Sequence, residues 1–364
     1  MNNRTERPSR FWLSVCLLGL LATLAQANPY ADVDWQQWQQ HRANLHTHTT
    51  LSDGGVTPAQ TIDRYRELGY TVLALTDHDT VGPKANREDP RKAETTWPWQ
   101  RFERDPAELG MVAIEGNEIS RVHHIGSYFT GYGNPDVESP EQVIEEIGQR
   151  GGLAVMCHPG RYDYSPDWYA GLFARFDHLV GIEVCNRTDR YPWDVALWDD
   201  VLQATMPDRP VWGFANDDMH RGEDIGRSWQ MLLLPEHTAE HVREAMTTGR
   251  FYFSTVYEAG RPAPTIRSIR VDEEAGTITI KADACQRIYW ISCGRIVGSG
   301  STFDAKRARR PERYVRAQLR GEYGYTFTQP FRLPIRQTTT DGPAQDKPQE
   351  SVMPAASASS PPEK

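Results

Sequence analysis

The chain has 364 residues, of which 38% are hydrophobic and 24% are charged, and this length suits one large soluble globular domain with a smaller one. The net charge of −9 argues against a nucleic-acid-binding surface of the usual basic kind, so no nucleic-acid partner is expected, although a local cationic pocket is compatible with it. The sequence contains no internal repeat.

The first 27 residues have the pattern of a secretory signal peptide. Three arginines precede an apolar run at 11–24, and Ala25-Gln26-Ala27 fits the small-residue cleavage pattern. The run is too short to span a membrane, and no stop-transfer segment follows it. We therefore expect a periplasmic or secreted protein without a membrane span, cleaved after Ala27, with a net charge of −11 once three Arg and one Glu are removed.

From residue 28 to 258, helix and strand signals alternate. The Gln-rich segment 30–42 carries two tryptophans and is predicted to be a short docking helix. Thr57 and Ser139 each precede a proline, a pattern typical of a helix N-cap, and glycines at 69 and 151 end the two predicted helices. A third helical pattern covers 193–202, and a polar excursion covers 83–106. Apolar runs predict buried strands at 70–76, 111–114, 153–157, 179–184 and 211–215.

These alternating elements favour a TIM-like α/β barrel, whose active sites lie at the carboxyl ends of the strands. The pattern changes from Pro262, where apolar and polar residues alternate with period two. We predict a small antiparallel β-sandwich domain at 259–337, with strands near 265–271, 277–281, 289–291, 314–319 and 325–327. Residues 338–364 are rich in Pro, Ala, Ser and Gln and are predicted to be disordered.

Four cysteines follow the predicted cleavage site. Export permits disulfides, and Cys285 with Cys293 would close a hairpin. Cys157 and Cys185 lie in apolar runs and equally suit buried free thiols.

Histidines recur beside carboxylates where the predicted strands end. His46 and His48 are two residues apart in an extended segment, so both imidazoles project to one side and can bind one metal ion. The histidines in such settings are His46, His48, His78, His123, His124, His158 and His220. The other four are expected to be structural or exposed: His41, His178, His237 and His241.

Five motifs in order resemble those of the PHP (polymerase and histidinol phosphatase) family of metal-dependent phosphoesterases, over about residues 44–230. They are His46-Thr47-His48 with Ser52-Asp53-Gly54, Thr76-Asp77-His78, Gly116-Asn117-Glu118 with His124-Ile125, His158-Pro159, and Asp218-Met219-His220. The resemblance implies a distorted (βα)7 barrel with two or three divalent ions of Zn, Mn or Fe. The ligands it implies are His46, His48, Asp53, His78, Glu118, His124, His158, Asp218 and His220.

Three of these positions have a neighbour of the same type, and the family pattern selects Glu118 over Glu115, His124 over His123, and Asp218 over Asp217. His123 stays an alternative to His124, or a group that supports it. Glu183, in an apolar run, is expected to shape the site, with direct metal binding as the alternative.

The resemblance implies an exported metal-dependent hydrolase that attacks a small-molecule phosphoester with a metal-bridged hydroxide. Protonated His78 or His220, or a third ion, would assist the leaving alkoxide. Arg161 and Arg227 each follow a ligand motif and would hold a phosphate oxygen, the alternative being surface ion pairs. Two other functions are kept: hydrolysis of a carboxylic or carbamate ester at the same metal site, and a non-catalytic metal- or ligand-binding protein, although no ligand is missing.

Overall fold

The computed structural model describes residues 28–78, 96–134, 136–188, 190–308 and 312–333. The predicted signal peptide, much of the excursion at 83–106 and the predicted tail at 338–364 lie outside these ranges. Within them, no helix combines the length and the apolar character needed to cross a membrane.

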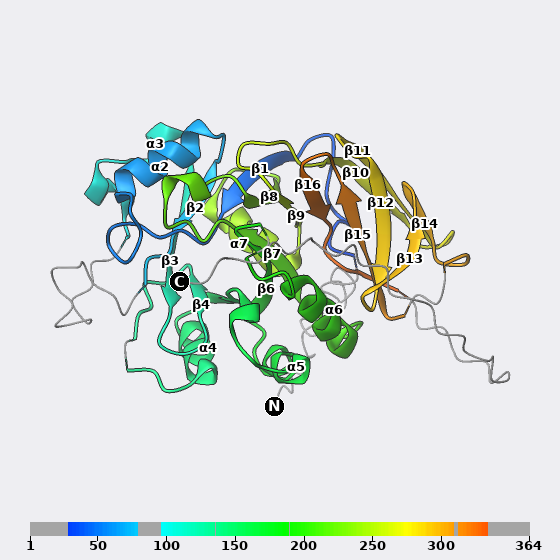
Figure 1. The fold of residues 1–364 in the computed structure, drawn as a ribbon, viewed down its shortest axis with the longest axis horizontal. Helices are drawn as coiled ribbons and strands as arrows, with labels where there is room; N and C mark the ends of the chain where they lie inside the picture. Colours follow the sequence, from blue (N-terminus) through cyan, green and yellow to red (C-terminus); the bar gives the residue numbers. More distant parts are fainter. Residues whose placement is uncertain (1–27, 79–95, 135, 189, 309–311, 334–364) are drawn as a thin grey trace, which may run out of the picture. The chain divides into compact units, whose positions relative to one another are not determined.

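The barrel is a mixed sheet in the order β9-β8-β1-β2-β3-β4-β5-β6-β7, seen in the left half of Figure 1. Its parallel pairs are β1–β2, β2–β3, β5–β6 and β6–β7, whereas β4, β8 and β9 pair antiparallel. The strands are β1 (Gln39–Asn44), β2 (Val72–Leu75), β3 (Val112–Ile119), β4 (Ile125–Tyr128), β5 (Leu153–Met156), β6 (Leu179–Asn186), β7 (Trp212–Asn216), β8 (Ser228–Leu234) and β9 (Phe251–Val256).

Glycine lets the two ends of this sheet approach each other. A Cβ atom on Gly213 of β7 would lie 2.7 Å from the ring of Phe253 on β9, so only a residue without a side chain fits there.

Helices cover the outside of the barrel. Thr57 and Ser139 cap the first two as predicted, since their hydroxyl groups accept from the backbone N–H groups of Gln60 and Gln142. The helices are α2 (Pro58–Glu67), α3 (Pro106–Leu109), α4 (Pro140–Gln149), α5 (Pro166–Arg175), α6 (Asp194–Thr205) and α7 (Ala239–Thr248), with 3-10 turns η3 (Trp99–Phe102), η4 (Pro159–Arg161) and η5 (Gly222–Asp224).

The C-terminal strands form the predicted antiparallel sandwich, in the right half of Figure 1. One of its sheets continues the barrel sheet, because β16 pairs with β9 and leads on to β15, β12 and β13. The strands are β10 (Thr265–Asp272), β11 (Thr277–Asp283), β12 (Arg287–Ser292), β13 (Arg295–Ser299), β14 (Thr302–Asp304), β15 (Tyr314–Arg320), β16 (Gly324–Phe327) and β17 (Phe331–Arg332). The second sheet, β10-β11-β14, packs Ile269 and Ile280 against Trp290, Val315 and Leu319 of the first. The predicted fold class is confirmed.

The prediction of a helix at 30–42 is wrong. This segment forms turns and then β1, which pairs with β8 from Gln39 to Ala43 and with β2 from Ala43. Strand pairing on both sides therefore overrides the local preference of the glutamines. The hairpin disulfide is also absent, since Cys285 and Cys293 are both free thiols in the structure.

A buried polar junction joins α6 of the barrel to the C-terminal strands. Arg316 of β15 donates from Nε and Nη2 to the two carboxylate oxygens of Asp199, at 2.8 and 2.5 Å, and the Tyr314 hydroxyl donates to Asp199 Oδ1 at 2.8 Å. Gln329 binds the backbone N–H and C=O of Gly213, both at 2.9 Å, and so pairs with β7 as a strand would. The predicted domain boundary at 258/259 falls between β9 and β10.

Candidate metal centre

The carboxyl ends of the barrel strands carry a compact cluster of imidazoles and carboxylates. Glu118, at the end of β3, lies at its centre and is 1% exposed. Five imidazoles approach its two oxygens to between 2.8 and 3.3 Å. They belong to His46, His48, His78, His124 and His158, which follow β1, β2 or β5 or precede β4.

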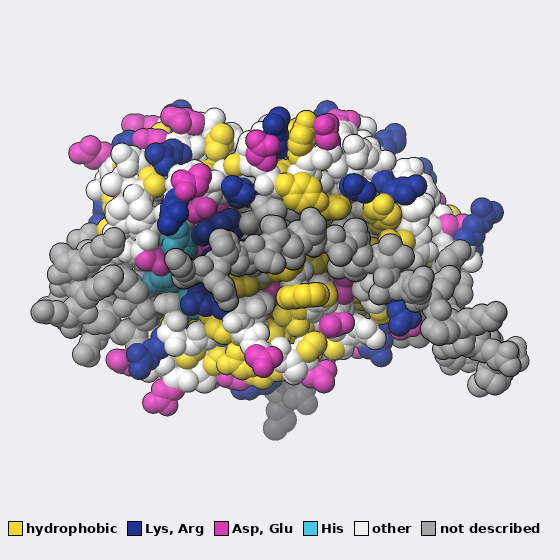
Figure 2. Space-filling view, viewed as in Figure 1, with side chains coloured by type: hydrophobic (Ala, Val, Ile, Leu, Met, Phe, Trp, Pro, Cys, Tyr) yellow, Lys and Arg dark blue, Asp and Glu magenta, His cyan; other side chains and the backbone are white. Residues whose placement is uncertain are grey.

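The outer part of the cluster is formed by Asp53, His78 and His220. Oδ2 of Asp53 lies 3.2 Å from Nε2 of His220 and 3.6 Å from Nε2 of His78. The side chain of Asp53 is 47% exposed and that of His220 is 26% exposed. Figure 2 shows histidine side chains in a hollow of the surface with basic and acidic side chains around it. A substrate therefore meets this side of the cluster first.

Asp218 joins the inner and outer parts. Its Oδ1 lies 3.2 Å from Nε2 of His48, 3.4 Å from Nε2 of His46 and 3.5 Å from Nδ1 of His220. With Asp218 included, the structure brings all nine ligands implied by the family resemblance into one cluster.

The neighbouring residues that compete for three of these roles point elsewhere. Asp217 accepts hydrogen bonds from the backbone N–H groups of Gly226, Arg227 and Ser228 and from the hydroxyl of Tyr65. It holds the loop after β7 and does not face the histidines. Glu115 is partly buried and contacts none of the clustered imidazoles in the described part of the chain.

His123 is used structurally. Its Nδ1 donates to the carbonyl oxygen of His124 and its Nε2 accepts from the hydroxyl of Tyr169, both at 2.8 Å. Burial lowers the pKa of His123 to about 3, so the ring stays neutral. It stacks on Tyr162, whose hydroxyl accepts the backbone N–H of His124 at 3.0 Å. His123 thus supports the segment that presents His124.

Glu183 on β6 orients the cluster. Its Oε1 accepts from Nδ1 of His46 and Nδ2 of Asn216, both at 2.8 Å, and its Oε2 accepts from the backbone N–H of His158 at 2.8 Å and Nδ2 of Asn186 at 3.2 Å. Four donors occupy this carboxylate, although it lies within ligand distance of His46 and His158. The bond to Nδ1 leaves Nε2 of His46 directed at Glu118, the arrangement by which outer carboxylates fix metal-binding histidines.

Asp77 performs a similar function for the loop that carries Asp53. Its carboxylate accepts from the backbone N–H groups of Thr49 and Ser52 and from both of their hydroxyl groups, at 2.6 to 3.0 Å. The second motif therefore contributes His78 to the cluster and Asp77 to the backbone of the first motif.

Two arginines that sequence reasoning did not single out contact the cluster. Nη1 of Arg190 binds Oδ2 of Asp218 at 2.5 Å, and Nη2 of Arg187 donates to the backbone oxygen of Asp218 at 2.6 Å. Both follow β6, and the rule that polar residues at strand ends build barrel sites would have selected them.

The two arginines predicted to bind phosphate are placed differently. Arg227 directs Nε and Nη1 to the backbone oxygens of Glu223 and Tyr257, both at 3.4 Å, and within the described residues its side chain contacts none of the nine clustered side chains. The structure therefore does not bring Arg227 to the site. Arg161 is exposed in η4, three residues after His158, where its backbone N–H donates to the oxygen of His158.

The backbone at these strand ends is strained. His158, Arg187, Thr188 and Asp218 have φ between 27° and 72°, a region that residues with side chains rarely adopt. Such conformations persist where surrounding contacts enforce them and are typical of functional sites.

The charges of the cluster are strongly coupled. Burial by itself raises the pKa of Glu118, but His46, His124 and His78 outweigh it and hold that pKa well below its usual range. Burial likewise lowers the pKa of His48, but Asp218 and Glu118 raise it to about 10. The carboxylates are thus ionised, and a cation that binds the ring nitrogen of His48 displaces a proton.

The cluster fits divalent metal ions. Ligand atoms bound about 2.0–2.2 Å from one ion lie roughly 3–3.5 Å apart, and the contacts around Glu118 have this spacing. Nδ1 of His48 and Nδ1 of His78 are buried without a hydrogen-bond partner, although they lie 3.6 Å from Asp53 Oδ1 and 3.2 Å from Glu118 Oε2. Unpaired buried nitrogens facing carboxylates are costly unless a cation joins them.

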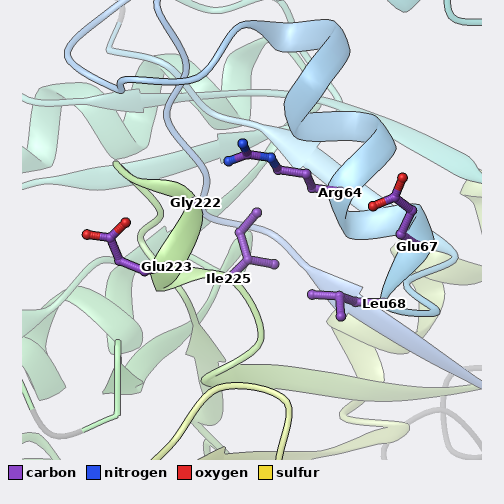
Figure 3. A pocket seen from close by; sticks show the side chains of 6 residues that line it. All are labelled: Arg64, Glu67, Leu68, Gly222, Glu223 and Ile225. Atoms are coloured by element: carbon purple, nitrogen blue, oxygen red, sulfur yellow. The ribbon is translucent and has the colours of Figure 1, made fainter.

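A shallow hollow of about 460 Å³ lies beside α2 and η5. Figure 3 shows its lining, in which Arg64, Glu67 and Leu68 face Gly222, Glu223 and Ile225. It contains none of the nine clustered residues and does not contribute to the metal centre.

No family model matches the chain. Curated relatives include the 5'-3' exoribonuclease Rnm of Salmonella typhimurium, 28% identical over 209 residues that cover 37% of this chain and 71% of the relative. An uncharacterized protein of Methanocaldococcus jannaschii is 30% identical over 162 residues, which cover 41% of this chain and 84% of that protein. The 3',5'-nucleoside bisphosphate phosphatase of Chromobacterium violaceum is 26% identical over 217 residues, which cover 39% of this chain and 76% of the phosphatase.

Among solved structures, a two-domain protein of Bacteroides vulgatus that contains a predicted PHP-like metal-dependent phosphoesterase has a similar fold. The TM-score is 0.53 at 17% identity, and the match covers 82% of this chain and 96% of the other. The likeness extends over both the barrel and the C-terminal strands at this coverage.

Proposed function

The chain belongs to the PHP (polymerase and histidinol phosphatase) family of metal-dependent phosphoesterases, and from this premise we propose that it hydrolyses a phosphate ester of a nucleotide-type substrate at the cluster around Glu118. It is a metal-dependent hydrolase that acts on phosphoesters. The observation that carries the proposal is the meeting of six imidazoles and three carboxylates at the strand ends. The relatives named for a nucleoside bisphosphate and for RNA support the substrate class.

We propose that the cluster holds two or three ions. Its ligand-distance groups overlap, and His46, His48, His78 and Glu118 each belong to more than one of them. Mixed imidazole and carboxylate donors suit Zn, Mn or Fe. When bound, such ions supply a water nucleophile at neutral pH and neutralise charge on the phosphoryl oxygens.

Residues of the chain itself are proposed to orient the metal ligands and to protonate the leaving oxygen. Glu183 fixes His46, and Asp77 fixes the loop of Asp53. His78 and His220, at the solvent side, are the groups nearest an entering ester and are proposed to deliver the proton that the leaving oxygen needs. Arg190 and Arg161 are proposed to bind the phosphate oxygens, in place of the predicted pair of Arg161 and Arg227.

The test combines metal analysis with turnover. The protein is loaded with Mn or Zn and assayed on a nucleoside 3',5'-bisphosphate, p-nitrophenyl phosphate, bis-p-nitrophenyl phosphate and p-nitrophenyl acetate. Glu118→Gln is the test variant, and Glu115→Gln on the same strand is its matched control. The proposal expects bound metal and phosphate release, both lost in Glu118→Gln and kept in Glu115→Gln.

Bound metal with turnover of the acetate alone would replace the phosphoesterase by an ester hydrolase. Bound metal without turnover of any substrate would indicate a binding protein. Loss of activity in both glutamine variants would show that the cluster around Glu118 is not the specific site.

We also propose that the protein is exported, on the basis of its first 27 residues. Mass analysis of the protein in the periplasmic or culture fraction is expected to show a chain that begins at Asn28. A cytoplasmic protein that retains Met1 would contradict this proposal.

A further inference from the structure

One side of the first sandwich sheet packs Tyr314 and Arg316 against α6, and beyond that contact the same side carries exposed arginines and half-buried tyrosines. Strand alternation directs Ile288, Trp290 and Leu319 into the core, and the residues between them outward. The outward residues, which we call the arginine–tyrosine face, are Arg287 and Tyr289 of β12, Gln318 and Arg320 of β15, and Tyr325 of β16.

Two like charges are opposed on this face. Arg287 pairs in register with Arg320 on the neighbouring strand, and both side chains are exposed. Among the described residues, neither arginine forms an ion pair with a carboxylate. Like charges directly opposite each other destabilise a sheet. An anion that binds both guanidinium groups would remove this cost.

Tyr289 lies beside the two arginines. The Arg287 guanidinium, and after it that of Arg320, hold the pKa of the Tyr289 hydroxyl below its usual value. The next residue across the sheet is Tyr325, the register partner of Arg320. Across the three strands the register therefore reads Arg287, Arg320 and Tyr325, two cations followed by an aromatic ring.

The face leads to the metal centre. Tyr325 pairs with Thr255 of β9, and the next residue, Val256, accepts a hydrogen bond from the hydroxyl of Thr188 at 2.7 Å. Thr188 follows Arg187, which contacts Asp218 and His220 of the cluster. Figure 2 shows basic side chains over the C-terminal strands on the same side of the molecule as the histidine hollow.

The acidic Asp199 meets this side of the sheet, where it is already paired with Arg316 of β15. Glu258 pairs with Arg261 at 3.0 Å, and Glu322 lies beside Tyr323. Arg320 lies about two strand spacings (~9.5 Å) and Arg287 about three (~14 Å) from Thr255. Neither arginine has a carboxylate partner within the described residues.

We propose that the arginine–tyrosine face binds single-stranded nucleic acid, a strand whose phosphorylated end reaches the metal centre. A guanidinium group can donate two parallel hydrogen bonds to the oxygens of one phosphate. Tyrosine rings stack on unpaired bases of any sequence. This inference rests on the proposed phosphoesterase function, and it revises the expectation drawn from net charge, because the positive charge here is local. Each phosphate contact made by this patch adds about 0.7 to the slope with which log K falls as log salt rises.

The test measures binding of a fluorescein-labelled oligouridylate to the chelator-treated full chain by fluorescence anisotropy at several salt concentrations. Arg287→Gln with Arg320→Gln is expected to weaken binding at least about tenfold and to reduce the slope of log K against log salt by about 1.4, or about 0.7 for each lost phosphate contact. Tyr289→Ala is expected to weaken binding about tenfold, and Tyr289→Phe to restore it.

The matched control is Arg267→Gln with Arg270→Gln, which removes the same charge from β10 on the other sheet. It is expected to bind as the wild type does. Equal weakening by both double variants, or by neither, would overturn the proposal. Equal affinity for polyglutamate would overturn nucleic acid as the ligand, since a peptide offers no bases to stack.

Turnover separates this inference from the function on which it rests. The ratio of kcat/KM for a phosphorylated oligonucleotide to that for p-nitrophenyl phosphate is expected to fall about tenfold in the double arginine variant. Binding of the oligonucleotide without any phosphate release would contradict the proposed phosphoesterase function and would still support the arginine–tyrosine face as a binding site. Phosphate release from p-nitrophenyl phosphate, with oligonucleotide binding unchanged in the double arginine variant, would contradict only the proposal that this face binds nucleic acid.

Discussion

At the junction, the buried carboxylate of Asp199 meets the buried guanidinium of Arg316, whereas at the metal centre five imidazoles surround the carboxylate of Glu118. In the first region opposite charges pair through two parallel hydrogen bonds, and Arg316 leaves only Nη1 without a partner. In the second, nitrogens face nitrogens, as in the 3.1 Å approach of His46 to His48.

The comparison distinguishes two kinds of buried polar group: those of the junction, which stabilise the fold by pairing with each other, and those of the metal centre, which need a bound ion as a partner. A closed ion pair contributes specificity and is costly to break, because removing one partner leaves a buried charge unpaired. A cluster of like donors is stable only with protons or metal ions between them. The junction should therefore control stability and the metal centre should control activity.

The largest expected effect is on stability. Asp199→Ala leaves Arg316 buried and unpaired and is expected to lower the free energy of unfolding by about 3–5 kcal/mol. The adjacent, exposed Asp200→Ala is the control and is expected to change it by less than about 0.5 kcal/mol. Urea unfolding measures both, and equal effects would mean that the junction does not stabilise the chain.

Next is the loss of a clustered imidazole. His158→Ala is expected to lower metal content and to reduce kcat/KM at least about 100-fold, more than the loss of an outer partner would. His178→Ala is the control, since His178 lies outside the cluster and binds the backbone oxygen of Ile144. Metal analysis and turnover check this, and a His158→Ala protein with full metal content would remove His158 from the ligand set.

A smaller effect is expected from the orienting carboxylate. Glu183→Gln is expected to weaken metal affinity about 10–100-fold while the number of ions bound at saturation stays the same. Titration against a competing chelator measures the affinity and the number of ions separately. Loss of one ion at saturation would instead make Glu183 a direct ligand.

The smallest expected effect is a pH dependence beside the metal centre. Burial raises the pKa of Asp194 to about 8 from 3.8, although its Oδ1 accepts the backbone N–H of Gly160. Between pH 3.8 and about 8, Asp194 therefore keeps its proton in the folded chain but loses it in the unfolded chain, where its pKa is 3.8. Stability from this group is present below pH 3.8 and is lost as the pH rises towards about 8.

Asp194→Asn keeps an acceptor for Gly160 and has no proton to lose. It is expected to stabilise the chain by about 1–2 kcal/mol at alkaline pH, with a gain that shrinks under acid conditions. Thermal unfolding across the pH range checks this, and a gain independent of pH would show that Asp194 is ionised in the folded state throughout.

The sequence by itself determined the features that depend on neighbours along the chain. The caps at Thr57 and Ser139, the buried strands and the period-two alternation after Pro262 were all predictable, because each depends on local backbone hydrogen bonds or on the burial of one face. The nine clustered residues were also accessible, since parallel strands deliver their ends to one edge and the ordered motifs resemble those of a family.

The tertiary structure decided what depends on residues far apart in sequence. Segment 39–44 became a strand because β2 and β8 pair with it, and Arg227 turned to carbonyl groups of its own loop and of β9 rather than to the cluster. Glu183 became an orienting group because donors 25 and 33 residues away along the chain converge on it. The opposition of Arg287 to Arg320 exists only in the register of β12 and β15, and no local pattern specifies that pairing.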